Sequence, residues 1–189
     1  MAQAKTLTQA ELKQVLGFIA LGNHAVRNRA MLLVTHYAGM RVGEVASLRY
    51  EDVIDELGQV RSEIRLDANQ TKGRHGRVVF VGERLRKELQ MYVSKVKPKS
   101  RTNKLFYSQK RTSDGFTANT LTQFFHYLYK RAGIDGSSHS GRRSFITNLA
   151  TKGVGVRVLM SLAGHRNIST TQAYIDVNDD MKRKAVELI

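Results

Sequence analysis

The chain of 189 residues is long enough for one well-buried domain, and its 41% hydrophobic and 25% charged residues argue against disorder. Its 31 Lys and Arg residues against 16 Asp and Glu residues give a formal net charge of +15, which favours a polyanionic partner: nucleic acid first, an anionic membrane surface second. No apolar run approaches the roughly 20 residues of a membrane span, so we expect nucleic acid and no membrane. The absence of cysteine excludes disulfides, thiol catalysis and cysteine-based zinc sites, and it fits a cytoplasmic protein.

The N-terminal part of the sequence predicts three helices. Thr8 to Glu11 has a capping-box pattern, and apolar residues follow it at helical spacing. A second helix is predicted from about Arg27 to Tyr37, with Gly39 as its end signal. The third begins near Arg41 and runs to about Leu48.

A change of periodicity then predicts a small sheet. Residues Val60 to Leu66 alternate between apolar and polar, and Arg77 to Val81 are mostly β-branched and aromatic. The segment Thr71 to Gly76 between them has the composition of a basic hairpin turn. We therefore expect a three-stranded antiparallel sheet.

Helical patterns return in the second half. They cover the segments around Leu85–Tyr92, Leu121–Leu128, Arg142–Ala150, Val156–Ala163 and, weakly, Met181–Leu188. Gly133, Gly153 and Gly164 follow three of them as end signals. The predicted fold class is α+β, mainly α, in a single domain over residues 1–189.

The run from Leu162 to Tyr174 is the most informative feature, because it holds His165 and Tyr174 at a fixed offset across a glycine turn. Taken alone, Tyr174 fits a half-buried core tyrosine better than a nucleophile. Arg41 alone fits a surface salt bridge to Glu44, and His165 alone fits a histidine at a helix C-terminus. Lys72 alone fits a hairpin-tip lysine.

Two further residues have equally plain alternatives: His139 as a histidine at a helix start and Arg142 as a solvated arginine. The combination of all these residues, however, suits phosphoryl transfer. An unperturbed tyrosine has a pKa near 10, so a tyrosine nucleophile needs a cationic pocket or a base. Arginine binds phosphate oxygens bidentately and stays charged, which makes a pair of arginines the natural partner of such a tyrosine.

The motifs resemble those of tyrosine recombinases, the phage integrase family. The family's Arg box, Gly-[Leu/Met]-Arg-[Ile/Val]-[Gly/Ser]-Glu, is matched by Gly39 to Glu44, and its hairpin lysine by Lys72. Its His-x-x-Arg box is matched by His139 and Arg142. Its Leu-x-Gly-His box, followed by Ser-Thr-Thr and Tyr, is matched by the run from Leu162 to Tyr174. The resemblance extends over about residues 7–177, which leaves 178–189 as a C-terminal tail or helix.

The resemblance implies a helical catalytic domain and a site-specific DNA recombinase, integrase-like or invertase-like, in a mobile genetic element. Tyr174 would form a 3′-phosphotyrosyl link. Arg41 and Arg142 would hold the scissile phosphate, and Lys72 would protonate the leaving 5′ oxygen. His139 would assist proton transfer, His165 would hydrogen-bond a phosphate oxygen, and Glu44 would orient Arg41. No metal, ATP or other cofactor is implied.

Two departures from the family pattern carry expectations. Gly141 stands before Arg142, where the family often has leucine, and we expect a looser helix start there. Most members also have an N-terminal DNA-gripping domain, whereas this sequence starts at the catalytic domain. A natural short member that works with this domain alone is favoured over an excised fragment.

Further basic residues are candidate DNA-phosphate contacts, with a solvated surface as the alternative: Arg74, Arg77, Lys97, Lys99 and Arg101. The remaining histidines lack the clustering of a metal site. The expected partner is double-stranded DNA, bound by a homo-tetramer on paired sites, with a monomer possible without DNA. Two other hypotheses stay open: an accessory factor that needs a partner recombinase, and a type IB topoisomerase that uses the same chemistry.

Overall fold

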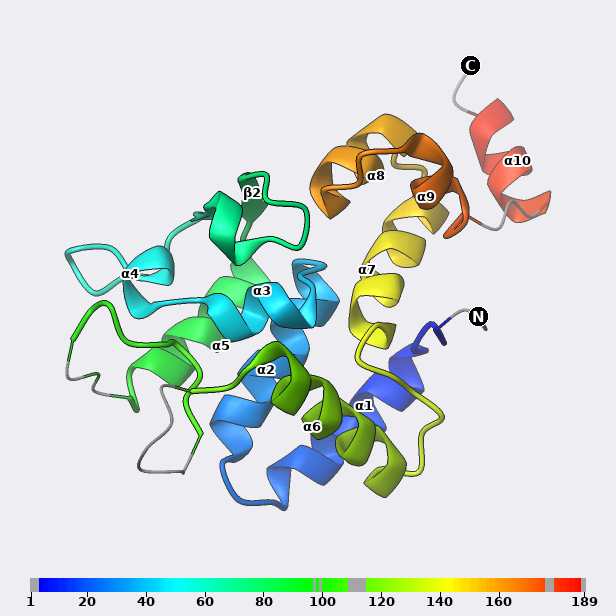
Figure 1. Cartoon of the computed structure of the whole chain (residues 1–189). Coiled ribbons are helices and arrows are strands. Elements are labelled where there is room, and N and C mark those ends of the chain that lie inside the picture. Colours follow the sequence, from blue (N-terminus) through cyan, green and yellow to red (C-terminus); the bar gives the residue numbers. More distant parts are fainter. Residues whose placement is uncertain (1–3, 97, 99, 109–114, 176–178, 188–189) are drawn as a thin grey trace.

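The structure, a computed structural model, describes residues 4–96, 98, 100–108, 115–175 and 179–187. It is mainly helical with one small antiparallel sheet, which confirms the predicted fold class. Figure 1 shows the elements in chain order. They are α1 (Gln9–Ala20), α2 (Ala25–Tyr37), α3 (Val42–Ser47), α4 (Tyr50–Val53), β1 (Glu63–Leu66), the 3-10 helix Ala68–Gln70, β2 (Arg77–Phe80), α5 (Glu83–Val93), α6 (Ala118–Arg131), α7 (Ser140–Thr151), α8 (Val156–Ala163), α9 (Ile168–Gln172) and α10 (Asp179–Val186).

Helix α1 begins where the capping box predicts. The Glu11 amide donates to Thr8 Oγ1 at 3.2 Å, and the Thr8 amide donates to the Glu11 carboxylate at 2.8 Å. Both bonds satisfy amide groups that have no partner inside the helix. The apolar face of α1 then packs on α2 through buried Leu12, Val15 and Ile19.

Helix α2 is the centre of the core. Residues 30–36 are all buried, because α1, α5 and α7 pack around this helix. His36 belongs to this buried stretch, and its Nδ1 atom has no hydrogen-bond partner. Burial, followed by the charge of Arg84, lowers the pKa of His36 to about 4. The ring is therefore neutral at pH 7, as a core position requires.

Gly141 tightens the start of α7 rather than loosening it. A Cβ atom at this position would lie 2.1 Å from Thr35 Oγ1 and 2.9 Å from Thr35 Cβ, on α2. Only glycine allows the two helix backbones to come this close. Helix α7 already begins at Ser140, and Gly141 is buried. The expected looser helix start is therefore not found.

The sheet has two strands, so the prediction of three was wrong. Strands β1 and β2 pair antiparallel, with Ile64 opposite Val79 and Leu66 opposite Arg77. Among the described residues, the further pairing consists of isolated bridges, Ile54 with Val60 and Arg49 with Lys104. Residues 50–53 form helix α4 instead, and this turn of helix prevents the bridges from extending into a third strand.

The β1–β2 loop and the α8–α9 turn come together at the site. Helix α8 packs against α7, α9 and β2, and Figure 1 shows α8 and α9 stacked beyond the end of α7. Helix α10 lies at the edge of the molecule, next to the C-terminus in Figure 1. No helix in the described ranges is long and apolar enough to cross a bilayer.

The close approach at Gly141 predicts a position-specific effect of alanine. Gly141→Ala should lower the free energy of unfolding by about 1–3 kcal/mol or more, because its Cβ forces α7 and α2 apart. Urea unfolding measures this change. Adding Thr35→Ala should restore part of the loss, since the atom at 2.1 Å is then removed.

The matched control is Gly17→Ala on α1, where a Cβ meets nothing within 4 Å. This change should raise the free energy of unfolding by roughly 0.5–1 kcal/mol. Equal effects at Gly141 and Gly17 would contradict the packing argument.

Candidate active site

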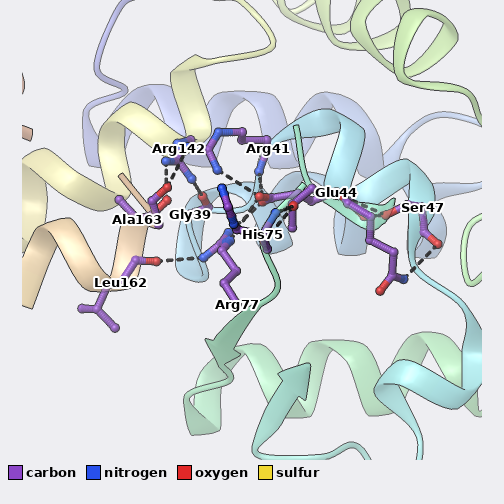
Figure 2. A network of polar contacts seen from close by, with 12 residues as sticks. Gly39, Arg41, Glu44, Ser47, His75, Arg77, Arg142, Leu162 and Ala163 are labelled. Carbon is purple, nitrogen blue, oxygen red and sulfur yellow. Dashed lines mark hydrogen bonds and ion pairs between the residues drawn. The ribbon is translucent and has the colours of Figure 1, made fainter. Parts of the chain in front are cut away.

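A buried carboxylate, Glu44 on α3, ties two arginines together. It is 1% exposed and accepts hydrogen bonds from Arg77 Nε at 3.1 Å and Nη2 at 2.7 Å. It also accepts from Arg41 Nη1 at 3.0 Å and from the Arg41 amide at 2.8 Å. Figure 2 shows Glu44 between the two guanidinium groups. Burial alone would raise the pKa of Glu44, but the bonds and charges of Arg77 and Arg41 outweigh it and hold that pKa below its ordinary value.

The C-terminal carbonyls of α8 are held by three arginines. Leu162 O accepts from Arg77 Nη1 at 2.9 Å, Ala163 O accepts from Arg142 Nη2 at 2.6 Å, and Gly164 O accepts from Arg41 Nη2 at 3.2 Å. Carbonyls in the last turn of a helix lack intrahelical partners and lie at the negative end of its dipole. The end of α8 is therefore a natural binding place for cationic side chains. We call Glu44 and these three arginines the arginine cluster.

Two glycines permit this arrangement. Gly164 ends α8 with φ of 60°, and a Cβ there would lie 2.6 Å from Arg77 Cδ. Gly39 has φ of 60°, its carbonyl accepts from Arg142 Nη1 at 2.5 Å, and a Cβ there would lie 2.4 Å from the Phe145 ring. Side chains other than glycine are strained at these φ values. Both predicted end signals thus serve the site as well as the helices.

The arginine cluster keeps an excess of positive charge. Three guanidinium groups face a single carboxylate. Arg142 is 4% exposed, and burial, followed by repulsion from Arg41, lowers its pKa below the ordinary value. An arginine nevertheless stays charged at neutral pH. The excess positive charge therefore suits the cluster to binding an anionic ligand.

Lys72 stands at the edge of a hollow beside the cluster. The hollow has a volume of about 760 Å³, and its lining includes Arg41, Lys72, Arg77 and His165. Lys72 is exposed and lies in the β1–β2 loop. A hydrogen bond within this loop, from Thr71 Oγ1 to the His75 carbonyl at 2.8 Å, stabilises its conformation. The loop thus places the lysine in the same hollow as His165.

His165 and Tyr174 lie side by side in the site. Their rings stack with centroids 5.6 Å apart and an angle of 26° between planes. His165 Nδ1 lies 2.9 Å from Thr171 Oγ1, which is fully buried. Burial, followed by the charges of Arg142, Arg41 and Arg77, lowers the pKa of His165 to about 4. The neutral ring can keep Nε2 as a donor when the Thr171 hydroxyl donates to Nδ1.

His139 lies at the start of α7 and is exposed. Burial of part of the ring, followed by the charges of Arg142, Lys72 and Arg41, lowers its pKa. These three cations all act on His139 because they surround the same site. The structure thus brings together Arg41, Lys72, His139, Arg142, His165 and Tyr174, from five separate segments of the chain.

The five basic residues predicted as DNA-phosphate contacts differ in how far their positions allow that role. All three guanidinium nitrogens of Arg77 are engaged inside the protein, so its position does not suit a phosphate contact. Arg74 is exposed on the loop. Arg101 donates to the carbonyls of Asp55 and Ile54 at 3.0 and 2.7 Å. Lys97 and Lys99 lie outside the described residues.

Sequence reasoning overlooked Thr171 and Arg143. Thr171 belongs to the Ser-Thr-Thr part of the matched motif, which could have indicated its role. Arg143 offered none beyond its place next to Arg142, although its guanidinium lies over the Tyr174 ring. Within the part of the chain that the structure describes, no group of three or more His, Cys, Asp and Glu side chains could hold a metal ion.

The arginine cluster predicts a large effect of removing one charge. Glu44→Gln leaves Arg41 and Arg77 without their anion, and we expect a loss of about 3–5 kcal/mol in the free energy of unfolding. Urea unfolding measures the loss, with Glu83→Gln as the control. Glu83 pairs with Arg86 on the exposed face of α5, where a change should cost at most about 1 kcal/mol. Similar losses in both variants would contradict a central role for Glu44.

The chain is similar to known proteins along almost its whole length. The family model described as the phage integrase family matches residues 5–181. The tyrosine recombinase XerA of Pyrococcus horikoshii is 30% identical over 184 residues, a match that covers 97% of this chain and 60% of that protein. This chain therefore spans about three fifths of the length of that relative.

Solved structures agree with this match. The crystal structure of XerA recombinase has a TM-score of 0.76 at 27% identity, covering 100% of this chain and 66% of that chain. The Tn1549 transposon integrase, solved in complex with a circular intermediate DNA, has a TM-score of 0.74 at 21% identity, covering 100% and 67%. The second likeness shows the shared fold alone. On the family match and the fold together, the chain belongs to the phage integrase family of tyrosine recombinases.

Proposed function

We propose that this chain is the catalytic domain of a site-specific DNA recombinase that cuts and rejoins strands through Tyr174. One observation carries the proposal: a tyrosine lies in the same site as a cluster with an excess of positive charge. A phosphodiester supplies the anion that such a cluster lacks, and the tyrosine supplies a nucleophile. Family membership supports the same chemistry.

The reaction is a reversible transesterification. The Tyr174 hydroxyl gives its proton to His139, which lines a second hollow together with Tyr174, and its oxygen attacks the scissile phosphorus. The bond from phosphorus to the 5′ oxygen breaks, and a 3′-phosphotyrosyl link forms. The leaving 5′ oxygen takes a proton, which Lys72 at the edge of the hollow is placed to give. A 5′ hydroxyl from another strand then attacks the link and frees Tyr174. One phosphodiester is exchanged for another, so the step needs no external energy source.

Arg41 and Arg142 stabilise the charge that develops on the phosphate oxygens. Electrostatic stabilisation is usually the largest single contribution to catalysis, and losing one donor costs roughly 10²–10³-fold in rate. Neutral His165 adds a hydrogen bond from Nε2, and exposed His139 assists proton transfer. Glu44 and Arg77 do not meet the phosphate; they fix Arg41 and the end of α8.

Tyr174 serves its own protomer's site. Three contacts support this step of the proposal: the stacked His165 ring, the Arg143 guanidinium, and the Thr147 hydroxyl, which donates to the Tyr174 carbonyl at 3.2 Å. All three hold the tyrosine against α7 and the α8–α9 turn of the same chain. A tyrosine delivered to a neighbour would have to leave them.

Double-stranded DNA is the proposed substrate, and the Tn1549 transposon integrase, which shares the fold, was solved in complex with DNA. Two paired sites with two strands each require four tyrosines, so we propose a tetramer on DNA, built from this chain alone or with a partner recombinase. The reaction takes place in the cytoplasm, and a mobile element is the proposed source of the sites.

Covalent capture tests the proposal. A library of nicked duplexes with a randomised central segment should yield adducts that resist denaturation, because the nick releases the short 5′ strand and prevents rejoining. Sequencing the captured DNA identifies the site, and mass spectrometry should place the link on Tyr174. Tyr174→Phe should abolish capture, whereas Tyr127→Phe, at an exposed side chain of α6, should leave it unchanged. Capture by Tyr174→Phe, or none by the unchanged protein, would refute the assignment.

Mixing inactive variants tests which protomer uses the tyrosine. If Tyr174 acts within its own site, a mixture of Tyr174→Phe and Lys72→Ala should stay inactive. Activity in the mixture would require sites composed of two chains, and it would contradict own-site action.

A further inference from the structure

We propose that Arg143 is a positioning residue for the nucleophile: its guanidinium holds the Tyr174 ring in the orientation from which the hydroxyl reaches the phosphate. The inference rests on the proposed function of Tyr174. Arg143 lies outside the matched motifs. Its role is to orient the nucleophile, and it does not contact the reacting atoms.

The Arg143 guanidinium lies directly over the Tyr174 ring. The Arg143 Cζ atom lies 5.2 Å from the centroid of the Tyr174 ring, within the range of a cation–π interaction. The ring also stacks on His165, which belongs to the α8–α9 turn. Helix α7 and that turn therefore both contact the nucleophile's ring.

Helix α7 holds the same tyrosine at a second point. Thr147, one helical turn after Arg143, donates its hydroxyl to the Tyr174 carbonyl at 3.2 Å. Residues four apart share one face of a helix. One face of α7 thus fixes both the backbone and the ring of Tyr174. The preceding residue, Arg142, points to another side and belongs to the arginine cluster.

Arg143 carries its charge in a nearly buried place. The residue is only 9% exposed, yet its guanidinium makes no ion pair with a carboxylate among the described residues. Its Nε donates to Thr6 Oγ1 at 3.2 Å, which fixes the head group. A nearly buried charge without an anion is costly, and the face of an aromatic ring offers partial compensation. The Tyr174 ring is in that place.

The Tyr174 ring needs a restraint because open space adjoins it. A hollow of about 610 Å³ adjoins it, lined by Arg143, His139, Ser137, Thr170 and Tyr174 among others. Tyr174 is half-buried, so its ring has open space into which it can turn. Arg143 removes that freedom. Misplacement of a reacting group by about 1 Å can cost on the order of 10²-fold in rate.

The test separates positioning from DNA contact. Single-turnover adduct formation on the captured DNA site should slow by roughly 10- to 100-fold in Arg143→Met, while DNA affinity stays the same. Arg143→Lys keeps the cation and should recover part of the rate. Arg131→Met is the matched control, because Arg131 of α6 lies over the Phe18 ring of α1, away from the site. A loss of affinity at unchanged saturated rate would overturn the inference, since it would make Arg143 a phosphate contact.

The Thr6 hydrogen bond gives a second, internal check. Thr6→Val should slow adduct formation in the unchanged background, because the arginine head group loses its anchor. It should have no further effect in Arg143→Met. Independent slowing in both backgrounds would contradict an action of Thr6 through Arg143.

A readout without DNA keeps the two proposals distinguishable. In NMR spectra of protein with labelled tyrosine rings, Arg143→Met should shift the Tyr174 ring signals towards those of a free side chain and leave the other six tyrosines in place. Unchanged Tyr174 signals would overturn the positioning role even if the protein cuts DNA. A shift in a protein that captures no DNA would uphold it and refute the recombinase proposal instead.

Discussion

The interaction on which the site depends is the capture of three arginines between one buried carboxylate and one helix end. Glu44 holds Arg41 and Arg77, and the last carbonyls of α8 hold Arg41, Arg77 and Arg142. Three like charges at close range in a poorly solvated place repel one another strongly. They are tolerated because the carboxylate, the helix dipole and the oriented carbonyls face them together. Removing any of these leaves an uncompensated buried charge.

The same arrangement prepares two of the arginines for a phosphate. All three guanidinium nitrogens of Arg77 donate to Glu44 or Leu162, so this side chain links α3 to the end of α8 in a fixed position. Arg41 and Arg142 instead donate partly to neutral carbonyls. A phosphate oxygen is the stronger acceptor, because hydrogen bonds between two charged groups are roughly twice as strong as neutral ones. A bound phosphodiester can therefore take over donors that are already in place, and little reorganisation is needed.

Much of this could be predicted from sequence. Three site residues, Arg77, Gly141 and Arg143, were misjudged or overlooked because their roles depend on contacts with distant parts of the chain. The capping box at Thr8, the glycine helix ends, the hairpin around Lys72 and the motif residues that meet in the site were all visible as local patterns. Arg77 was misjudged because its partners lie 33 and 85 residues away. Gly141 was misjudged because its effect depends on Thr35 of another helix, and Arg143 was overlooked because it depends on Tyr174. The plain alternative for Tyr174, a half-buried tyrosine, describes its packing correctly. Its local sequence does not show the positively charged side chains that the fold brings close to it.

The most direct measurement is a structure of the protein with orthovanadate and two DNA strands that end in a 3′ and a 5′ hydroxyl at the cleavage site. Our account predicts vanadium between Tyr174 Oη and the 5′ oxygen, with Arg41 and Arg142 on the equatorial oxygens at about 2.7–2.9 Å. It also predicts that Arg77 remains on Glu44 and Leu162. A vanadate bound elsewhere, or a Tyr174 hydroxyl turned away while both arginines keep their α8 carbonyls, would contradict the central claim that this cluster is a phosphate site for Tyr174.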